Sequence, residues 1–155
     1  TQYFDLGERG SLALLGDATY LLSFERQAST GAAVIEEAGE YSYPELLASL
    51  AVRWTKGKWR STFGMNYTSS YNDDPDTRTL AAIGLPADAE VEVDAWTVFD
   101  LSVSYDVSEN TWLRVKVDNL FDEDPPRALA TGDNVDFYNH NSLGRFITVR
   151  LTHSF

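Results

Sequence analysis

The sequence has no cysteine and no long apolar run. Without thiols, a disulfide framework and thiolate zinc sites are excluded, and the absence is compatible with an oxidising compartment. No stretch approaches the roughly 18 consecutive apolar residues that a membrane-spanning helix needs. If this chain lies in a membrane, it must therefore cross as β-strands of a barrel, because a barrel also satisfies every backbone group in lipid. Otherwise its 155 residues, 43% of them hydrophobic, are enough for one ordinary soluble core.

Basic residues are scarce, with 12 of them against 24 acidic residues and a net charge of −12. The excess lies in three segments, 27–44, 73–93 and 121–142, which together hold fourteen acids and only two bases, Arg78 and Arg127. The rest of the chain is neutral. The negative field of these three acidic segments repels polynucleotides and attracts cations, so we expect no nucleic-acid partner. Acidic loops that simply stay hydrated would produce the same pattern.

The sequence also lacks the common signatures of catalysis. It has no cysteine nucleophile, no Gly-rich phosphate loop and no Gly-x-Ser-x-Gly elbow. Carboxylates at Asp94, Asp100 and Asp118 suggest an acid/base pair. However, the water-facing side of a β-sheet in a barrel needs polar side chains of this kind in any case. We therefore expect no enzyme activity, no catalytic residue and no bound cofactor.

Alternation of apolar and polar side chains predicts six long strands, at 11–25, 45–55, 58–72, 94–106, 111–120 and 143–155. Each is long enough to cross a bilayer, for which a tilted strand needs about 9 to 11 residues. The last strand places its apolar and polar residues on opposite faces. The apolar set is Ile147, Val149, Leu151 and Phe155, and the polar set is Thr148, Arg150, Thr152 and Ser154.

The connections alternate between short and long. Short turns at 7–10, 55–58 and 106–110 alternate with long loops at 26–44, 73–93 and 121–142. Gly57 suits the positive φ of a tight hairpin. Short periplasmic turns and long extracellular loops are typical of bacterial outer-membrane barrels. The pattern therefore predicts an all-β fold, a segment of an antiparallel up-and-down transmembrane barrel with about six full strands, and residues 1–6 as the tail of a seventh.

The carboxyl-terminal part resembles TonB-dependent outer-membrane receptors. The resemblance rests on the run Val117-Asp118-Asn119-Leu120-Phe121-Asp122, the prolines Pro125 and Pro126, and Gly144-Arg145 opening the last strand. In that family an Asn-Leu-Phe-Asp segment ends the penultimate strand and Gly-Arg opens the last one. Segments 18–22 and 99–105 are similar to recurrent strand phrases of the same family, so the likeness covers the whole chain.

The resemblance implies a barrel of 22 strands occluded by a plug domain, in the outer membrane of a Gram-negative bacterium. Residues 1–155 would be its carboxyl-terminal portion, with the plug, the TonB box and the earlier strands absent. The implied function is TonB-energised uptake of a scarce ligand such as a ferric siderophore, haem, cobalamin or an oligosaccharide. The implied partners are outer-membrane lipid and lipopolysaccharide, the barrel assembly machinery, the imported small molecule, and TonB only through the missing plug.

A few loop residues are candidates for a site. Asp73, Asp74 and Asp76 offer oxygen ligands of the kind that calcium takes, although an Asx-rich turn explains them better and we expect no dedicated metal site. His140, in the last outer loop, is a possible contact for an incoming ligand, because such loops carry receptor specificity. A purely structural histidine is the simpler interpretation.

Two other readings stay open from the sequence. One is a small complete outer-membrane barrel that serves as an adhesin or a structural protein. The other is a soluble β-sandwich that binds carbohydrate through its loops. A lipid-facing apolar band would make the isolated chain aggregate without detergent, whereas a sandwich would stay soluble.

Phe155 is predicted to be an outer-membrane assembly signal, because barrels of this kind commonly end on an aromatic residue. Deleting Phe155 from the native protein should slow or abolish insertion into the outer membrane. Pulse-labelling followed by membrane fractionation measures this. Insertion at the wild-type rate and level would contradict the prediction.

Overall fold

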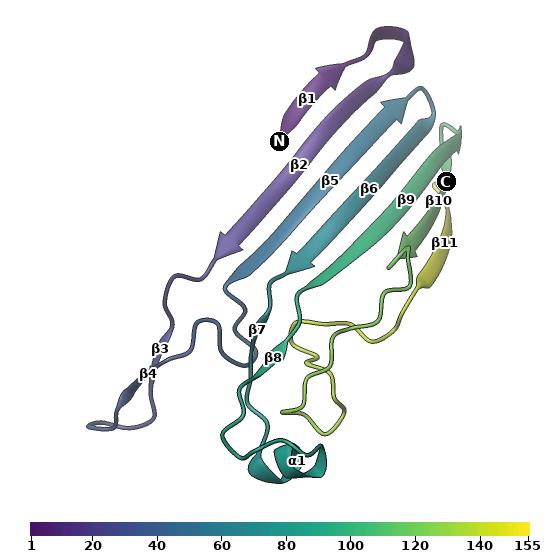
Figure 1. Cartoon of the computed structure of the whole chain (residues 1–155). Helices are drawn as coiled ribbons and strands as arrows, with labels where there is room; N and C mark the ends of the chain where they lie inside the picture. The colour runs from purple at the N-terminus through teal and green to yellow at the C-terminus, as the bar shows by residue number, and fades with distance from the viewer.

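Seven strands form one continuous antiparallel sheet in the computed structural model, which describes all of residues 1–155 (Figure 1). Their order in the sheet is β1-β2-β5-β6-β9-β10-β11. The bounds are Gln2–Asp5 (β1), Ser11–Tyr20 (β2), Leu46–Lys56 (β5), Trp59–Thr68 (β6), Trp96–Ser108 (β9), Thr111–Asp118 (β10) and Phe146–His153 (β11). The six predicted strands are thus confirmed, and residues 1–6 contain a seventh that pairs with β2. None of the helical segments is long and apolar enough to cross a membrane.

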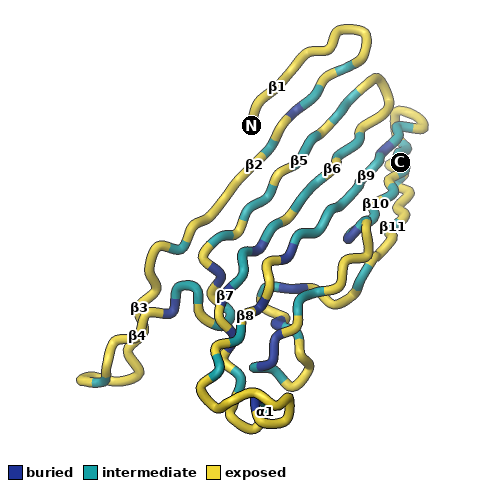
Figure 2. The backbone as a smooth tube through the Cα atoms, in the orientation of Figure 1, coloured by how far each residue is buried: buried dark blue, intermediate teal, exposed yellow.

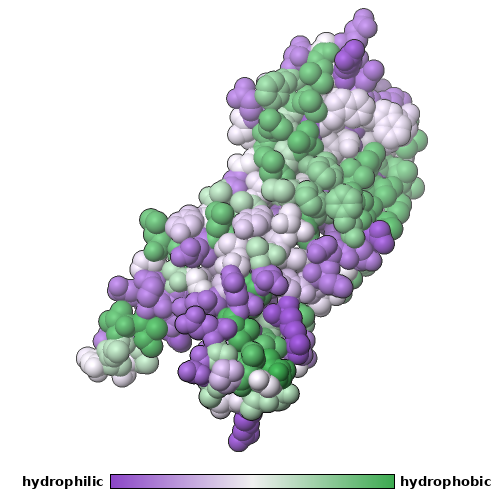
Figure 3. Space-filling view, in the orientation of Figure 1, coloured by the Kyte–Doolittle hydropathy of each residue, from purple (hydrophilic) through white to green (hydrophobic).

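The register of the sheet separates an apolar face from a polar face. Leu50 lies opposite Met65, and Met65 lies opposite Phe99, so apolar side chains form lateral rows across β5, β6 and β9. Cross-strand aromatic pairs strengthen these rows, with ring centroids 5.6 Å apart for Phe63 and Phe99. Apolar side chains gather over the strands in Figure 3, whereas hydrophilic ones surround the loops.

The sheet has no second layer, and the buried residues gather elsewhere. Leu50 is 48% exposed and Leu151 is 67% exposed, although both are large and apolar. Most of the buried residues lie in the long loops or at the strand ends next to them, where Tyr71, Val93 and Ala128 form a small core (Figure 2). A soluble β-sandwich would instead bury one face of this sheet against another sheet.

Tight turns join the strands at one end of the sheet (Figure 1). A short 3-10 turn, Gly7–Arg9, connects β1 to β2, and Gly57 has the predicted positive φ, 54°, between β5 and β6. Gly10 has a φ of 93°, and a Cβ at this position would lie 2.1 Å from the Thr55 carbonyl oxygen of the neighbouring turn. Glycine is therefore required here both by backbone conformation and by space.

The long loops all lie at the other end, as the alternation predicted. They carry small elements of their own: β3 (Glu25–Gln27) pairs with β4 (Val34–Glu36), and β7 (Tyr71–Asp73) pairs with β8 (Val91–Val93). A short helix, α1 (Thr77–Ala82), follows β7.

Two predicted strands run too far into these loops. The segment 11–25 leaves the sheet after Tyr20, and the segment 58–72 leaves it after Thr68. Beyond Tyr20 the Ser23 hydroxyl and the Phe24 N–H donate to the Glu36 carboxylate, and beyond Thr68 residues 71–73 pair with 91–93 in a separate sheet. Alternation continues through both points, so only the partner strand reveals where the sheet ends.

Replacing Gly10 with alanine should destabilise the native protein more than replacing Gly7, because both positions have a positive φ but only Gly10 touches a neighbouring carbonyl. We expect a difference of at least about 1 kcal/mol in the free energy of unfolding. Thermal loss of heat-modifiable electrophoretic mobility in detergent measures it. Equal effects of Gly7→Ala and Gly10→Ala would show that the packing of the two turns does not matter.

Candidate functional site

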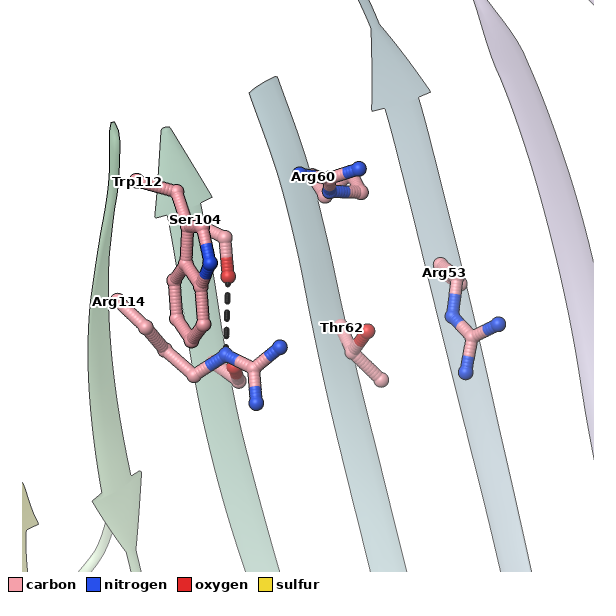
Figure 4. A pocket seen from close by; sticks show the side chains of 7 residues that line it. Arg53, Arg60, Thr62, Ser104, Trp112 and Arg114 are labelled. Carbon is pink, nitrogen blue, oxygen red and sulfur yellow. Dashed lines mark hydrogen bonds between the residues drawn. The ribbon is translucent and has the colours of Figure 1, made fainter. Parts of the chain in front are cut away.

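Two hollows stand out, one on the polar face of the sheet and one among the long loops. The first has a volume of about 620 Å³ and lies towards the tight-turn end. Arg53 of β5, Arg60 of β6 and Arg114 of β10 direct their side chains into it, with Ser104 and Thr62 between them (Figure 4). Its lining is completed by Ser102 and Trp112. This hollow offers many hydrogen-bond donors and a positive field.

Contacts within this hollow hold Arg114 in place. Its Nε donates to the Ser104 hydroxyl at 3.1 Å, and its guanidinium lies 5.1 Å from the centre of the Trp112 ring. Arg60 forms an ion pair with Asp106. The arrangement leaves the outer N–H groups of Arg114 directed at the open space (Figure 4).

The second hollow is an outer cleft, also of about 620 Å³. It is lined by Arg26, Ile35, Glu36, Glu37, Glu40, Tyr41, Ser42, Tyr43, Asp73, Asp74 and Tyr138. Five carboxylates face one cation, Arg26, which is already paired with Glu37 at 2.7 Å. Hydrogen bonds from Ser23 and from the Phe24 N–H lower the pKa of Glu36 to about 2. The outer cleft is therefore negative at physiological pH and bordered by tyrosines.

Asp136 ties the three long loops together. Its carboxylate is fully buried and accepts hydrogen bonds from the Tyr71 hydroxyl at 2.7 Å, the Asn139 amide at 2.8 Å and the Ser42 hydroxyl at 3.2 Å. Burial by itself would raise the pKa of Asp136, but these hydrogen bonds and the Tyr138 N–H outweigh it and lower the pKa. Burial and the same carboxylate raise the pKa of Tyr71. Asp136 therefore stays charged and Tyr71 stays a donor.

His140 lies beside this hub and is only 5% exposed. Its ring is stacked on Tyr71, with centroids 6.1 Å apart, and meets the edge of Trp96 at 5.2 Å. Neither ring nitrogen has a hydrogen-bond partner. Burial lowers the pKa of His140, against the opposing effect of Asp136, so the ring is neutral. The ring packs beneath the loop surface. Its role as a ligand contact stays a prediction.

The three acidic candidates make different contacts. Asp73 accepts hydrogen bonds from the backbone N–H groups of Leu129 and Ala130, and Asp76 caps α1 by accepting from the Thr79 N–H at 2.7 Å. Asp74 lines the outer cleft. No group of three or more histidine, aspartate or glutamate side chains is close enough to hold a metal ion. The loop contacts explain Asp73 and Asp76 as structural residues, and ion binding remains untested.

The family motif forms a clamp between the end of β10 and the start of β11. The Asn119 side chain closes a turn with the Glu123 backbone, by hydrogen bonds of 2.8 and 2.9 Å. Asp122 accepts from the Arg145 N–H at 2.7 Å, and the Arg145 guanidinium reaches the Leu120 carbonyl at 3.4 Å. Gly144, with a φ of 64°, would bring a Cβ within 3.1 Å of the Asp122 carboxylate.

The two aromatic residues at predicted positions, Phe121 and Phe155, have different surroundings. Phe121 packs edge-on against Phe99, with ring centroids 5.4 Å apart. Phe155 lies beyond the end of β11, fully exposed apart from an edge contact with His153. Its role in assembly stays a prediction.

Sequence reasoning missed Tyr71, Asp136 and the arginine hollow. The alternation of 58–72 places Tyr71 in a spanning strand, and Asp136 is one acid among many in its loop. Both become recognisable only when the loops are packed together. The arginines could have been found by asking which strand residues of one face share a lateral row.

The buried, neutral His140 should make the loop cluster sensitive to mild acid. A free imidazole protonates below a pKa of about 6.5, so lowering the pH from 7.5 to 5.5 favours the state in which His140 is released. Stability contributed by the neutral ring is complete above that value and falls as the pH drops. We expect hydrogen-exchange protection around Tyr71 and Asp136 to weaken by about two- to fivefold over this range.

The variant His140→Phe keeps the ring packing but cannot be protonated, and its protection should not change between pH 7.5 and 5.5. Asp136 stays ionised across this range because its pKa is lowered from 3.8. The same pH dependence in the phenylalanine variant would assign the effect to another group.

Comparison with known proteins adds three findings. The sequence profile described as "TonB dependent receptor-like, beta-barrel" matches residues 2–120. The ferric enterobactin receptor PfeA of Pseudomonas aeruginosa is 17% identical, with a TM-score of 0.60, over 99% of this chain and 21% of PfeA. The ferric-catecholate import receptor Fiu of E. coli K12 is also 17% identical, with a TM-score of 0.56, over 97% of this chain and 19% of Fiu. No curated protein matches.

The likeness to PfeA and Fiu concerns the fold, and this chain spans only about a fifth of either receptor's length. The family profile, in contrast, covers most of the chain, from β1 to the end of β10. Members of the family are barrels of the Gram-negative outer membrane, which explains the lipid-facing apolar rows described above. This chain belongs to the family of TonB-dependent receptor β-barrels.

Proposed function

We propose that residues 1–155 are the carboxyl-terminal part of the barrel of a receptor that imports a scarce small ligand through energy supplied by TonB. The observation that carries this proposal is the family match over residues 2–120. The seven strands support it, since their short turns and long loops alternate as in outer-membrane barrels. In this proposal the chain supplies part of the wall and three outer loops, and a plug and earlier strands belong to the same polypeptide.

The outer cleft is the part of this chain best placed to meet an incoming ligand. Its carboxylates make the local potential negative, which raises the concentration of cations and lowers that of anions. Tyr41, Tyr43 and Tyr138 add aromatic surface, and Tyr138 is 90% exposed. Among ferric siderophores, haem, cobalamin and oligosaccharides, this surface favours a neutral or cationic ligand with an apolar part.

The remaining partners follow from the same proposal. Lipid would cover the apolar face, and divalent ions could bridge the acidic loops to lipopolysaccharide. The assembly machinery would read Phe155, and TonB would act only through the plug. We expect no catalysis, because the sequence carries no signature of a catalytic nucleophile or phosphate loop and Asp100 of the polar face already accepts the Asn119 N–H.

The mass of the native polypeptide tests this proposal directly. An antibody to residues 121–142 should detect, in an outer-membrane fraction, a product several times larger than 17.3 kDa. Such a product has room for a plug and the remaining strands. A product near 17.3 kDa would support a small complete barrel and overturn the transport proposal.

Uptake by living cells refines the test. Deleting the gene should abolish energy-dependent uptake of one ligand from a panel of the four classes, and the wild-type gene should restore it. The double variant Glu40→Gln/Asp74→Asn should reduce uptake if the outer cleft binds the ligand. Asp133→Asn, which changes an acid outside the outer cleft, serves as the matched control.

A further inference from the structure

One charged side chain lies on the lipid-facing side of the sheet. Lys56 is the exposed last residue of β5, and alternation along the strand places it on the same face as Trp54 and Val52. The register assigns no other Asp, Glu, Lys or Arg to this face in any of the seven strands. A cation on the lipid face of a barrel is costly except near the membrane boundary. Lys56 therefore marks that boundary at the tight-turn end.

The ammonium group of Lys56 has no carboxylate partner in the chain. The ion pairs are formed by four other cations, Arg26, Arg60, Lys116 and Arg145. On one side Lys56 lies opposite Trp59 of β6, and on the other side it borders Gly10. A Cβ at Gly10 would lie 2.9 Å from the Lys56 Cβ, so this glycine leaves the space beside the lysine open. The counter-charge must come from outside the sheet.

Four side chains of β5 and β6 form one patch around this charge. Lys56 is the cross-strand partner of Trp59, and Trp54 is the cross-strand partner of Ser61 in the next row on the same face. Diagonal neighbours in such an arrangement are about 7 to 8 Å apart, within reach of long side chains. We call Trp54, Lys56, Trp59 and Ser61 the turn-end patch.

Both tryptophans of the turn-end patch are held by contacts within the chain. The Trp54 indole N–H donates to the Arg9 carbonyl of the neighbouring turn at 2.9 Å. The Trp59 ring lies 4.6 Å from the Tyr105 ring, centroid to centroid, and Trp59 is still 48% exposed. Tryptophan prefers the membrane–water interface, where its ring is apolar and its N–H finds a partner. The two rings therefore frame Lys56 at the depth of the lipid headgroups.

Ser61 adds a hydroxyl one row deeper into the membrane. It is the only polar member of its lateral row, whose other members are Phe4, Leu12, Trp54, Val103, Val115 and Val149. This row lies about 7 Å nearer the middle of the sheet than Lys56, the advance of two strand residues. Beyond it come the apolar residues Val52 and Phe63. A cation, a hydroxyl and an apolar surface thus follow each other in the order of phosphate, ester and acyl chain in a glycerophospholipid.

We propose that the turn-end patch binds one anionic glycerophospholipid of the periplasmic leaflet. The Lys56 ammonium group pairs with the phosphate, and the Ser61 hydroxyl donates to an ester carbonyl. The acyl chains lie over Val52 and Phe63, between the two tryptophans and the middle of the sheet. Charge complementarity selects this occupant, because the patch carries one unbalanced positive charge and a basic residue at a membrane surface attracts anionic lipids.

A photoactivatable lipid tests the proposal in the native outer-membrane protein. The probe is phosphatidylglycerol with a diazirine near the carboxyl end of one acyl chain, mixed into phosphatidylcholine vesicles that hold the protein. Ultraviolet light should join it to residues 54–63, as mapped by mass spectrometry. Unlabelled phosphatidylglycerol should suppress the adduct. Phosphatidylcholine with the same diazirine should give a clearly lower yield at these residues.

Substitutions separate binding by charge from ordinary contact with lipid. Lys56→Gln should lower the adduct yield about fivefold, whereas Lys56→Arg should preserve it. Ser61→Ala should lower it about threefold through the lost hydrogen bond. Lys58→Gln is the matched control, because it removes the same charge from the same hairpin, but Lys58 lines a hollow with Trp112 on the polar face. The yield in Lys58→Gln should not change.

Several results would overturn the proposal. They are equal yields from the two photoactivatable lipids at residues 54–63, a yield that Lys56→Gln leaves unchanged, or an equal loss in Lys58→Gln. Suppression by inorganic phosphate would assign Lys56 to a free anion, and suppression by lipopolysaccharide alone would assign it to the other leaflet. Heat-modifiable mobility identifies the variants that are folded barrels. The comparison of the two lipids on the wild type needs no variant.

This inference goes beyond the proposed function and is tested separately from it. It concerns the contact of the barrel wall with the membrane and holds for any imported ligand. A failed uptake assay leaves the lipid adduct unaffected, and a missing lipid adduct leaves the uptake assay unaffected.

Discussion

A strand that crosses lipid must find partners for all its N–H and C=O groups in neighbouring strands, because the bilayer core offers no water. The continuous ladder from β1 to β11 meets this requirement for the five inner strands, whereas the outer edges of β1 and β11 have no partner strand within this sheet. Antiparallel pairing in a fixed register then places every second residue on the same face, so each lateral row becomes wholly lipid-facing or wholly lumen-facing. The apolar rows around Phe63 and Phe99 and the polar rows around Ser102 and Ser104 are two results of this one constraint.

Packing energy is concentrated outside the sheet. The lipid-facing side chains remain exposed in the isolated chain, whereas the loops contain their own small core around Tyr71, Val93 and Ala128. Asp136 contributes to this arrangement because a buried carboxylate is costly unless donors surround it. Its donors come from all three long loops or their neighbourhood, so satisfying one charge holds three segments together. The loop end is therefore a defined surface with an outer cleft.

Negative and positive charges are concentrated at opposite ends of the strands. The loops carry the acidic excess of the chain, while Arg53, Arg60 and Arg114 lie on the polar face towards the tight turns. Between them, the Asp100 carboxylate accepts hydrogen bonds from the Asn119 N–H and from the Asn66 amide, each at 3.0 Å. Its role is therefore to stabilise the sheet. The motif residues Asn119, Asp122 and Arg145 likewise act through backbone hydrogen bonds, joining β10 to β11 across a long loop. Their part in this chain is to hold the last two strands in register.

By itself the sequence determined the strands, their order along the chain, the end of the sheet at which each connection lies and the family. These features depend on local periodicity and turn chemistry, which residues such as Gly57 and the alternation of 147–151 carry without reference to distant segments. Only the tertiary structure decided where the strands ending at Tyr20 and Thr68 stop, and which loop residues matter. The hub of Tyr71 and Asp136 joins residues 65 positions apart, and the hollow on the polar face brings together Arg53, Arg60 and Arg114 from three strands. Such sets are created by strand register and loop packing, and no local pattern in the chain records which distant residues become neighbours.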